Sequence, residues 1–295
     1  MKPLGLIVNP AANRGRGNLV GDRAVAAFRE IGIPTLDLSS NSAELAKAKA
    51  FEEAEKLSGI IAIGGDGTSQ LGVNIAMETG LPLGLIPAGS GNDQVRELGI
   101  ALNDPEGAAF NISESLAKPR SVDVMWIETA YRSFWSLGSI SAGFDALCAA
   151  KANTLTWPKG PNSYVAAMLL ELPKFRPIQY RLVADGVERN FAAMLCGVAN
   201  VKNFGGGMKI SPSSEITDGE LEVFILHEVS RAKLLQIFPK VYSGEHVNYP
   251  EVEIFKAKQI RVENKGFPIS CDGEIIGPAP FSATVTPGGL TLLSR

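Results

Sequence analysis

The sequence contains few of the residues that build metal centres and hydrolase sites. Among its 295 residues there are only two histidines, His227 and His246, and neither has the spacing of a metal ligand. It also lacks a Gly-x-Ser-x-Gly elbow, which argues against both a zinc hydrolase and a Ser-His-Asp hydrolase. The three cysteines (Cys148, Cys196 and Cys271) are an odd number among apolar or small neighbours. They indicate reduced core residues and not a disulfide framework.

Long apolar runs are missing as well, because no run approaches the roughly 20 residues that a membrane-spanning helix needs. Charge is nearly balanced, with 28 Lys and Arg against 31 Asp and Glu and a net charge of −3 at pH 7. This balance does not favour a nucleic-acid partner, whose binding depends on phosphate neutralisation. Hydrophobic residues make up 45% and charged residues 20%, an ordinary globular composition. We therefore expect a cytoplasmic protein that is long enough for two domains and binds no nucleic acid.

The first half of the sequence alternates short apolar runs with amphipathic stretches. Predicted strands and helices follow one another as strand Leu4–Val8, helix Leu19–Ile31, strand Thr35–Leu38, helix Ala43–Leu57, strand Ile60–Ile63, helix Ser69–Thr79 and strand Leu81–Ile86. This alternation predicts an α/β domain with a doubly wound parallel sheet. Ligands of such sheets bind outside the carboxyl ends of the strands.

Three predicted strands end in loops suited to phosphate. Asn9 follows the first strand, Gly64-Gly65-Asp66-Gly67-Thr68 follows the third, and Pro87–Asp93 follows the fourth. A helix start offers free N–H groups and the positive end of a dipole, and glycines let a phosphate approach the backbone. We expect one cleft made of these loops, with Asp66 holding Mg²⁺ directly or through water.

From about Ser121 the pattern changes to period-two alternation, interrupted by Asp-Gly pairs that are typical of hairpins. These pairs are Asp185-Gly186, Asp218-Gly219 and Asp272-Gly273. The prediction is an α/β domain over residues 1–120 and a mainly antiparallel β domain over residues 121–285. Whether the tail, 286–295, returns to the first domain stays open.

The motifs together resemble a known family. They are Gly64–Thr68, Pro87–Asp93, Ser141-Ala142-Gly143-Phe144-Asp145, Phe204-Gly205-Gly206-Gly207-Met208 and Asp272-Gly273-Glu274. In this order, over nearly the whole chain, they resemble the diacylglycerol kinase catalytic family, in particular the soluble bacterial lipid kinases related to sphingosine kinases. The resemblance implies an N-terminal ATP-binding α/β domain and a C-terminal β-sandwich. It also implies Mg²⁺-dependent transfer of a phosphate from ATP to a lipid hydroxyl, most simply that of diacylglycerol.

The resemblance also assigns roles to residues. The ATP site would comprise Asn9, Pro10, Ala11, Ala12, Asn13, Ser39 or Ser40, Gly64, Gly65, Asp66, Gly67, Thr68, Ser69, Gln70, Gly89, Ser90, Gly91 and Asn92. Ser90 stands where the family usually has threonine. Glu274 matches the proposed proton acceptor and would be catalytic together with Asp66. A structural Mg²⁺ would lie at Asp218, with Glu215 and Glu220 contributing backbone carbonyls, although a plain hairpin turn fits Asp218-Gly219 equally well.

Other functions stay open at this stage. A Gly-Gly-Asp-Gly turn also occurs in NAD kinases and sugar kinases, and a nucleotide- or lipid-binding module without catalysis would share much of the pattern. Asp66 and Glu274 favour an enzyme. A lipid acceptor implies transient peripheral contact with a membrane, and the oligomeric state, including a homodimer, stays open. The stretch Tyr164–Leu170 suits a lipid-lining helix, but packing in the core explains it more simply.

Overall fold

The computed structural model describes residues 1–89, 91–158 and 161–294, and the chain forms two compact units. The N-terminal unit comprises Met1–Val124, Trp135–Leu137 and the last residues from Pro287. The C-terminal unit comprises Met125–Phe134 and Gly138–Thr286. The first border between the two units thus falls after Val124, four residues beyond the boundary predicted from the sequence at residue 120.

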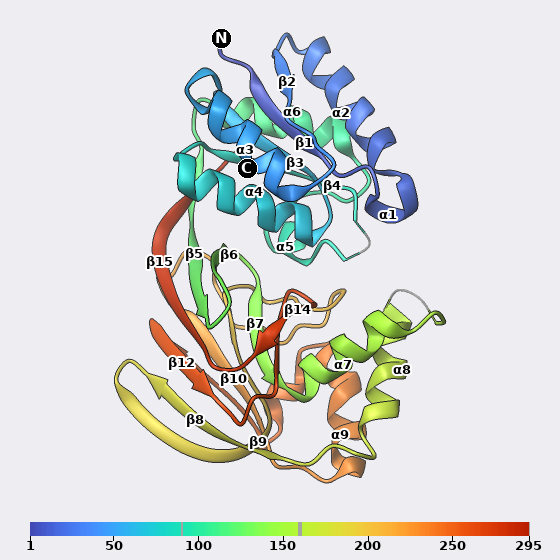
Figure 1. Cartoon of the computed structure of the whole chain (residues 1–295), viewed down its shortest axis with the longest axis vertical. Coiled ribbons are helices and arrows are strands. Elements are labelled where there is room, and N and C mark those ends of the chain that lie inside the picture. Colours follow the sequence, from blue (N-terminus) through green and yellow to red (C-terminus); the bar gives the residue numbers. More distant parts are fainter. Residues whose placement is uncertain (90, 159–160, 295) are drawn as a thin grey trace. The chain divides into compact units, whose positions relative to one another are not determined.

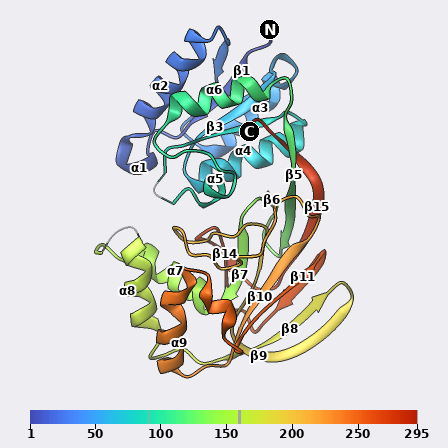
Figure 2. The same ribbon diagram turned by 180° about the vertical axis from the view of Figure 1, so that it is seen from behind.

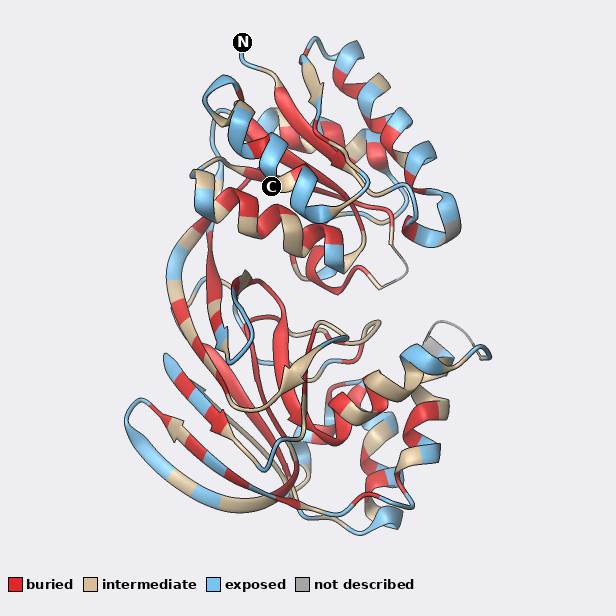
Figure 3. Cartoon of the chain, in the orientation of Figure 1, coloured by how far each residue is buried: buried red, intermediate tan, exposed pale blue. Residues whose placement is uncertain are grey.

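The N-terminal unit is built on a parallel sheet in the order β2–β1–β3–β4. The strands are β1 (Leu4–Val8), β2 (Thr35–Asp37), β3 (Gly59–Gly64) and β4 (Leu83–Pro87). Strand β15 (Phe281–Leu292) joins the sheet at its end, where Leu292 pairs with Leu83 of β4. Strands β3 and β4 are buried along their whole length and β1 nearly so (Figure 3), which explains why they read as continuous apolar runs.

Helices cover both faces of this sheet. They are α1 (Ala12–Gly15), α2 (Gly17–Glu30), α3 (Ala43–Glu53), the 3₁₀ turn η1 (Ala54–Lys56), α4 (Asp66–Thr79), α5 (Asp93–Glu97) and α6 (Pro105–Ser115). Helix α2 packs against α6, and α3 packs against α4. The two opposite views show these pairs on opposite faces (Figures 1 and 2). The predicted doubly wound α/β domain is confirmed.

Two helices of this unit differ from the prediction. Helix α4 begins at Asp66, three residues before the predicted start at Ser69, because extended Gly65 already accepts the N–H groups of Thr68 and Ser69 at 2.9 and 3.0 Å. Helix α6 was not predicted. Its start carries a readable signal, since Asp104 caps Gly107 N–H at 2.9 Å and a proline follows the cap.

The C-terminal unit is mainly antiparallel, as predicted. Beyond residue 120 the strands are β5 (Arg120–Thr129), β6 (Ser133–Ser136), β7 (Ser139–Gly143), β8 (Ile178–Ala184), β9 (Val187–Ala199), β10 (Leu221–His227), β11 (Val252–Ala257), β12 (Gln259–Glu263), β13 (Pro268–Cys271), β14 (Glu274–Pro278) and β15. The first half of strand β9 pairs with β8. Its second half pairs with β7 on one edge and with β10 on the opposite edge. Strand β9 therefore pairs with strands of both parts of the sandwich, which packs around a shared hydrophobic core.

Helices gather on one side of this unit, α7 and α8 in contact with each other and α9 nearby (Figure 1). They are α7 (Phe144–Thr154), α8 (Pro161–Glu171) and α9 (Arg231–Ile237), followed by the 3₁₀ turns η2 (Phe238–Val241) and η3 (Glu245–Asn248). The three cysteines are buried, as expected from the sequence, and none forms a disulfide within the described residues. Within the described residues, no helix is both long and apolar enough to cross a bilayer.

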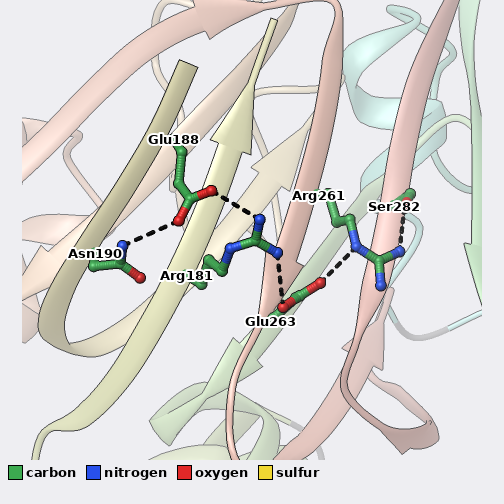
Figure 4. A network of polar contacts seen from close by, with 6 residues as sticks. All are labelled: Arg181, Glu188, Asn190, Arg261, Glu263 and Ser282. Carbon is green, nitrogen blue, oxygen red and sulfur yellow. Dashed lines mark hydrogen bonds and ion pairs between the residues drawn. The ribbon is translucent and has the colours of Figure 1, made fainter. Parts of the chain in front are cut away.

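The solvent face of the C-terminal sheet carries a chain of ion pairs (Figure 4). Arg181 bridges Glu188 at 2.8 Å and Glu263 at 3.2 Å, and Arg261 joins the same Glu263 at 2.7 Å. The two Arg181 pairs cross to neighbouring strands and suit their register, whereas Arg261 and Glu263 lie on the same strand, β12. All these side chains are about a third to half exposed. Solvent therefore screens each pair, and the pairs contribute little to stability.

Candidate functional site

The loops that follow β1, β3 and β4 are joined by hydrogen bonds at the carboxyl edge of the N-terminal sheet. Asn9 Nδ2 donates to Thr68 Oγ1 at 3.2 Å, which links the first loop to the second. The N–H groups of Ala88 and Gly89 both donate to the carbonyl of Gly64, at 2.7 and 3.1 Å, which links the third loop to the second. The residues predicted from separate motifs therefore meet at one edge.

Close backbone approach explains the glycines of these loops. A Cβ added to Gly89 would lie 2.4 Å from Gly65 Cα, and one added to Gly64 would lie 2.2 Å from Thr68 Oγ1. Neither contact is tolerable, so these positions need glycine for packing, before any ligand is considered. The packing also holds the amino end of α4, with its partial positive charge, at the carboxyl edge of the sheet.

Asp66 has an unexpected set of partners. Its Oδ2 accepts the N–H of Asn92 and its Oδ1 accepts the N–H of Asp93, both at 3.0 Å. Burial, with a smaller contribution from the nearby Asp93 carboxylate, raises the pKa of Asp66, and the backbone N–H groups partly oppose this rise. The sequence suggested a ligand for Mg²⁺, whereas the structure shows a carboxylate that anchors the third loop.

The remaining predicted residues of the second and third loops differ in their burial and in their hydrogen-bond partners. Asn92 Nδ2 donates to the Gly89 carbonyl at 2.8 Å, and its Oδ1 accepts Gly89 N–H at 3.1 Å, so these two residues close a small ring. Ser69 is buried, and Gln70 Nε2 donates to the carbonyl of Trp135 in β6. Ser90 lies outside the described residues, and a Cβ on Gly91 would contact Asp66 Oδ2 at 2.5 Å.

A cavity of about 450 Å³ lies beside β1 and β2. Of the predicted residues, Pro10, Ser39 and Ser40 line it. Ser39 Oγ accepts Val8 N–H at 2.9 Å, and this bond fixes the ends of the two strands against each other. The structure thus brings both serine candidates to one wall of the same cavity.

Asp37, at the end of β2, lines the same cavity and was missed in the sequence. Its Oδ1 accepts Ser39 N–H at 2.8 Å. An acid at the end of the second strand is the signal that could have identified it, because in nucleotide-binding α/β folds such an acid often bonds a ribose hydroxyl.

The residues predicted beside Asn9 form a turn and the short helix α1. Asn9 Oδ1 accepts Ala11 N–H at 3.0 Å, and Asn13 has a positive φ of 46°. Ala12 is buried, while Ala11 and Asn13 are exposed. Asn9 thus uses its amide oxygen to shape its own loop and one of its two amide N–H groups to reach Thr68.

Glu274 is exposed at the start of β14, after a tight turn with positive φ at Asp272 (49°) and Gly273 (84°). Asp272 Oδ1 accepts Ser139 N–H at 3.0 Å, and Asn153 Nδ2 donates to the Gly273 carbonyl at 3.5 Å. The backbone under Glu274 is therefore fixed from two sides, while its carboxylate meets solvent. That combination suits a group that receives a proton from a bound substrate.

The predicted metal turn holds a lysine. Lys256 Nζ lies 2.5 Å from Asp218 Oδ2 and 3.6 Å from Glu220 Oε2. The other Asp218 oxygen accepts Glu220 N–H at 3.0 Å, and the Glu215 carbonyl accepts Asp218 N–H at 3.4 Å. Across the described residues no group of three acidic, histidine or cysteine side chains could hold a metal ion. In this arrangement the turn does not fit a Mg²⁺, because an ammonium already neutralises Asp218.

We expect Asp218→Ala to lower the free energy of unfolding by about 1–2 kcal/mol, and by the same amount in excess MgCl₂ and in EDTA. The loss reflects a partly exposed ion pair with Lys256 and one hydrogen bond to the Glu220 backbone. Urea unfolding in both solutions measures it, with Asp22→Ala, which removes an exposed acid of α2 in the N-terminal unit, as the control. If MgCl₂ stabilises the wild type but not Asp218→Ala, the turn does bind Mg²⁺, as the resemblance implies.

A second unusual carboxylate is buried in the C-terminal unit. Asp145, in the first turn of α7, accepts a hydrogen bond from Ser141 Oγ. Burial raises the pKa of Asp145 from 3.8 to about 6, against the opposing effect of that hydrogen bond. The carboxyl is therefore protonated in the folded protein at pH values where it is already ionised in the unfolded chain.

This difference predicts a pH-dependent stability. The folded state holds the proton more tightly, so the stability contributed by Asp145 is complete below about pH 4 and is lost as the pH rises to about 6. We expect Asp145→Asn to raise the free energy of unfolding relative to wild type, by roughly 2 kcal/mol more at pH 7.5 than at pH 4. Urea unfolding at both pH values measures the gain. An equal effect at the two values would show that the carboxyl does not titrate in this range.

Comparisons with known proteins agree with this architecture. Residues 3–127 match the diacylglycerol kinase catalytic domain, and residues 138–294 match the YegS C-terminal NAD kinase beta sandwich-like domain. A diacylglycerol kinase from Mycobacterium tuberculosis is 33% identical over 97% of this chain and 93% of its own length. A diacylglycerol kinase from Bacillus subtilis is 28% identical over 95% of this chain and 92% of its own.

Solved structures show the same fold. A diacylglycerol kinase structure from Bacillus anthracis str. Sterne superposes with a TM-score of 0.74 at 20% identity, covering 100% of this chain and 97% of the other. An α/β unit with linked glycine loops, followed by a β-sandwich-like unit, thus defines a kinase that phosphorylates an alcohol group. The chain belongs to the diacylglycerol kinase family, in its bacterial lipid kinase branch.

Proposed function

We propose that the protein transfers the γ-phosphate of ATP, bound as its Mg²⁺ complex, to the hydroxyl of diacylglycerol or a related lipid. The observation that carries the proposal is the linked set of loops at one sheet edge, in which Asn9 reaches Thr68 and Asp66 holds the Asn92–Asp93 backbone. Phosphoryl transfer needs mainly positioning and charge stabilisation. A rigid edge that presents a helix start supplies both.

The roles of individual groups follow from their surroundings. The amino end of α4 and the amide of Asn9 would bind phosphate oxygens, while the cavity lined by Asp37 and Ser39 has room for the nucleoside. Mg²⁺ neutralises phosphate charge when ATP binds and usually keeps several waters. Both Asp66 oxygens already accept N–H groups, so we assign Asp66 to holding the loop.

Glu274 would accept the proton of the lipid hydroxyl as the new phosphate bond forms. Its exposure leaves its carboxylate accessible to a substrate, and the tight turn before it fixes the backbone that carries it. A lipid acceptor also requires access to a bilayer, so we propose transient contact of the protein with a membrane surface.

An alternative acceptor is NAD, because the C-terminal match is to a domain described as similar to the NAD kinase sandwich. Purified protein with Mg-ATP and labelled γ-phosphate would be offered diacylglycerol, monoacylglycerol, sphingosine and ceramide in mixed micelles, with NAD in a parallel reaction. We expect labelled phosphatidic acid. Phosphorylation of NAD without any labelled lipid would reject the proposal.

A further inference from the structure

Helix α4 holds the backbone of Trp135 with two side chains that lie further along the helix than Asp66. Trp135 N–H donates to Asn74 Oδ1 at 2.9 Å, and Asn74 Nδ2 donates to the Trp135 carbonyl at 2.9 Å. Gln70 Nε2 donates to the same carbonyl. Because a backbone N–H can only donate and a carbonyl can only accept, these partners also fix which end of the Asn74 amide is oxygen. Asn74 therefore holds both polar backbone groups of Trp135, as a neighbouring strand would.

The chain that leaves Trp135 is held in the same manner at Ser139. Ser139 N–H donates to Asp272 Oδ1 at 3.0 Å, and the Ser139 carbonyl accepts Asp272 N–H at 3.1 Å. The two residues that follow Trp135 are completely buried. A Cβ added to Gly138 would lie 1.8 Å from Asp272 Oδ1, so the chain passes directly against that carboxylate. A short buried segment, Trp135–Ser139, is thus fixed at both of its ends.

The two ends of this segment are attached to the two parts of the proposed reaction. Its first end is held by α4, whose amino end would bind phosphate oxygens. Its second end is held by Asp272, which opens the tight turn before Glu274. A displacement of about 1 Å at a reacting group, even when a distant substitution causes it, can cost on the order of 10²-fold in rate. A residue that fixes this segment can therefore affect the proton acceptor without touching the substrate.

We propose that Asn74 is a positioning residue for phosphate transfer, which acts through the Trp135 backbone and Asp272 to keep Glu274 in place. The step it serves is the one in which the lipid hydroxyl oxygen bonds to the γ-phosphorus. The bond between that phosphorus and ADP breaks, and the hydroxyl proton passes to the Glu274 carboxylate. The inference rests on the proposed function and adds to it a residue that the sequence motifs did not single out.

Amide hydrogen exchange tests the connection without any kinase activity. In Asn74→Ala, measured on the full chain without ATP or lipid, Trp135 N–H loses its acceptor and should exchange faster. We expect the N–H groups of Ser139 and Asp272 to exchange about tenfold faster as well, since a segment released at one end opens more often at the other. Mass spectrometry of overlapping peptides gives these rates. Faster exchange at Trp135 alone, with wild-type rates at Ser139 and Asp272, would overturn the proposal.

Kinetics then show whether Asn74 acts through Glu274. We expect Asn74→Ala to lower kcat about 10–100-fold, while the KM values for ATP and for the lipid stay within about threefold of wild type. In a Glu274→Ala background the same substitution should cause no further loss, because the group that Asn74 positions is absent. A full additional loss in that background, or a raised KM for ATP with unchanged kcat, would contradict a role through Glu274.

A second variant covers the case in which Asn74→Ala does not fold. Asn74→Asp keeps the volume and the oxygen that accepts Trp135 N–H, but it places its other oxygen against the carbonyls of Trp135 and Gln70. It should therefore show the same faster exchange and the same lowered kcat. Wild-type exchange and kinetics in Asn74→Asp would overturn the proposal.

The matched control is Glu78→Ala on the same helix, which removes a partly exposed ion pair with Lys47. We expect its exchange rates at Ser139 and Asp272, and its kcat, to equal those of wild type. Equal losses in Glu78→Ala and Asn74→Ala would show a general loosening of α4 and would overturn the proposal. Absence of kinase activity in the wild type would reject the proposed function, and the exchange rates would still show whether Asn74 holds this segment.

Discussion

Glu274→Ala is expected to lower kcat for lipid phosphorylation by about 10²–10⁴-fold, the usual contribution of a positioned proton acceptor. The midpoint of thermal unfolding should stay within a degree or so of wild type, because the Glu274 side chain is exposed and has no hydrogen bond in the described structure that its removal would break. The turn beneath it is held by Asp272 and Asn153, which the substitution leaves in place. Steady-state kinetics at saturating ATP and a thermal melt give the two readouts.

The matched control for this prediction is Glu188→Ala. Glu188 is also exposed, on strand β9 of the same unit, and makes only surface ion pairs and hydrogen bonds. Its loss should leave kcat unchanged. Glu274→Gln should be nearly as inactive as the alanine variant, because an amide keeps the shape and cannot take a proton. Activity of Glu274→Ala within a few-fold of wild type would mean that another group accepts the proton.

Local patterns were sufficient to predict much of the N-terminal unit. Strands β1, β3 and β4 are buried apolar runs, and burial on both faces of a parallel sheet makes such runs readable in one dimension. The convergence of Asn9 with Thr68 also followed, since the carboxyl ends of parallel strands share one edge. These predictions needed only periodicity and topology.

The partners of acidic side chains could not be predicted in the same way. Lys256 neutralises Asp218 across 38 residues of sequence, through the pairing of β10 with β11. Asp123, on the alternating strand β5, is buried and accepts Gly288 N–H at 2.7 Å. Each contact depends on register between distant strands, and no local signal in the sequence encodes it.

Helix α7 shows a different limit. It follows Gly143, whose φ of 124° is accessible to glycine, and it has no capping side chain to mark its start. Its buried residues include Phe144, Ala146 and Cys148, so apolar side chains do not form one clear stripe. The motif Ser141–Asp145 was recognised from the sequence, but the buried environment that raises the pKa of Asp145 became evident only from packing.

Asp66→Ala is expected to lower kcat/KM by at least about 10²-fold and to destabilise the N-terminal unit by roughly 2–4 kcal/mol. The substitution leaves the N–H groups of Asn92 and Asp93 without acceptors, and each buried donor left unpaired costs about 1–3 kcal/mol. The relief of a buried charge, shown by the raised pKa of Asp66, offsets part of that cost. Urea unfolding without ATP or Mg²⁺ gives the stability, and kinetics with the lipid acceptor give the activity.

The same variant separates an anchoring role from a metal-binding role. An anchor predicts destabilisation without any ligand, and it predicts that Asp66→Asn is no rescue, because the amide nitrogen would face one of two N–H donors at 3.0 Å. A metal ligand predicts unchanged stability of the ligand-free protein and a raised Mg²⁺ requirement, partly restored by Mn²⁺. Loss of activity with unaltered ligand-free stability would therefore contradict the anchor, since the loop that Asp66 holds is hydrogen-bonded to it before any nucleotide binds.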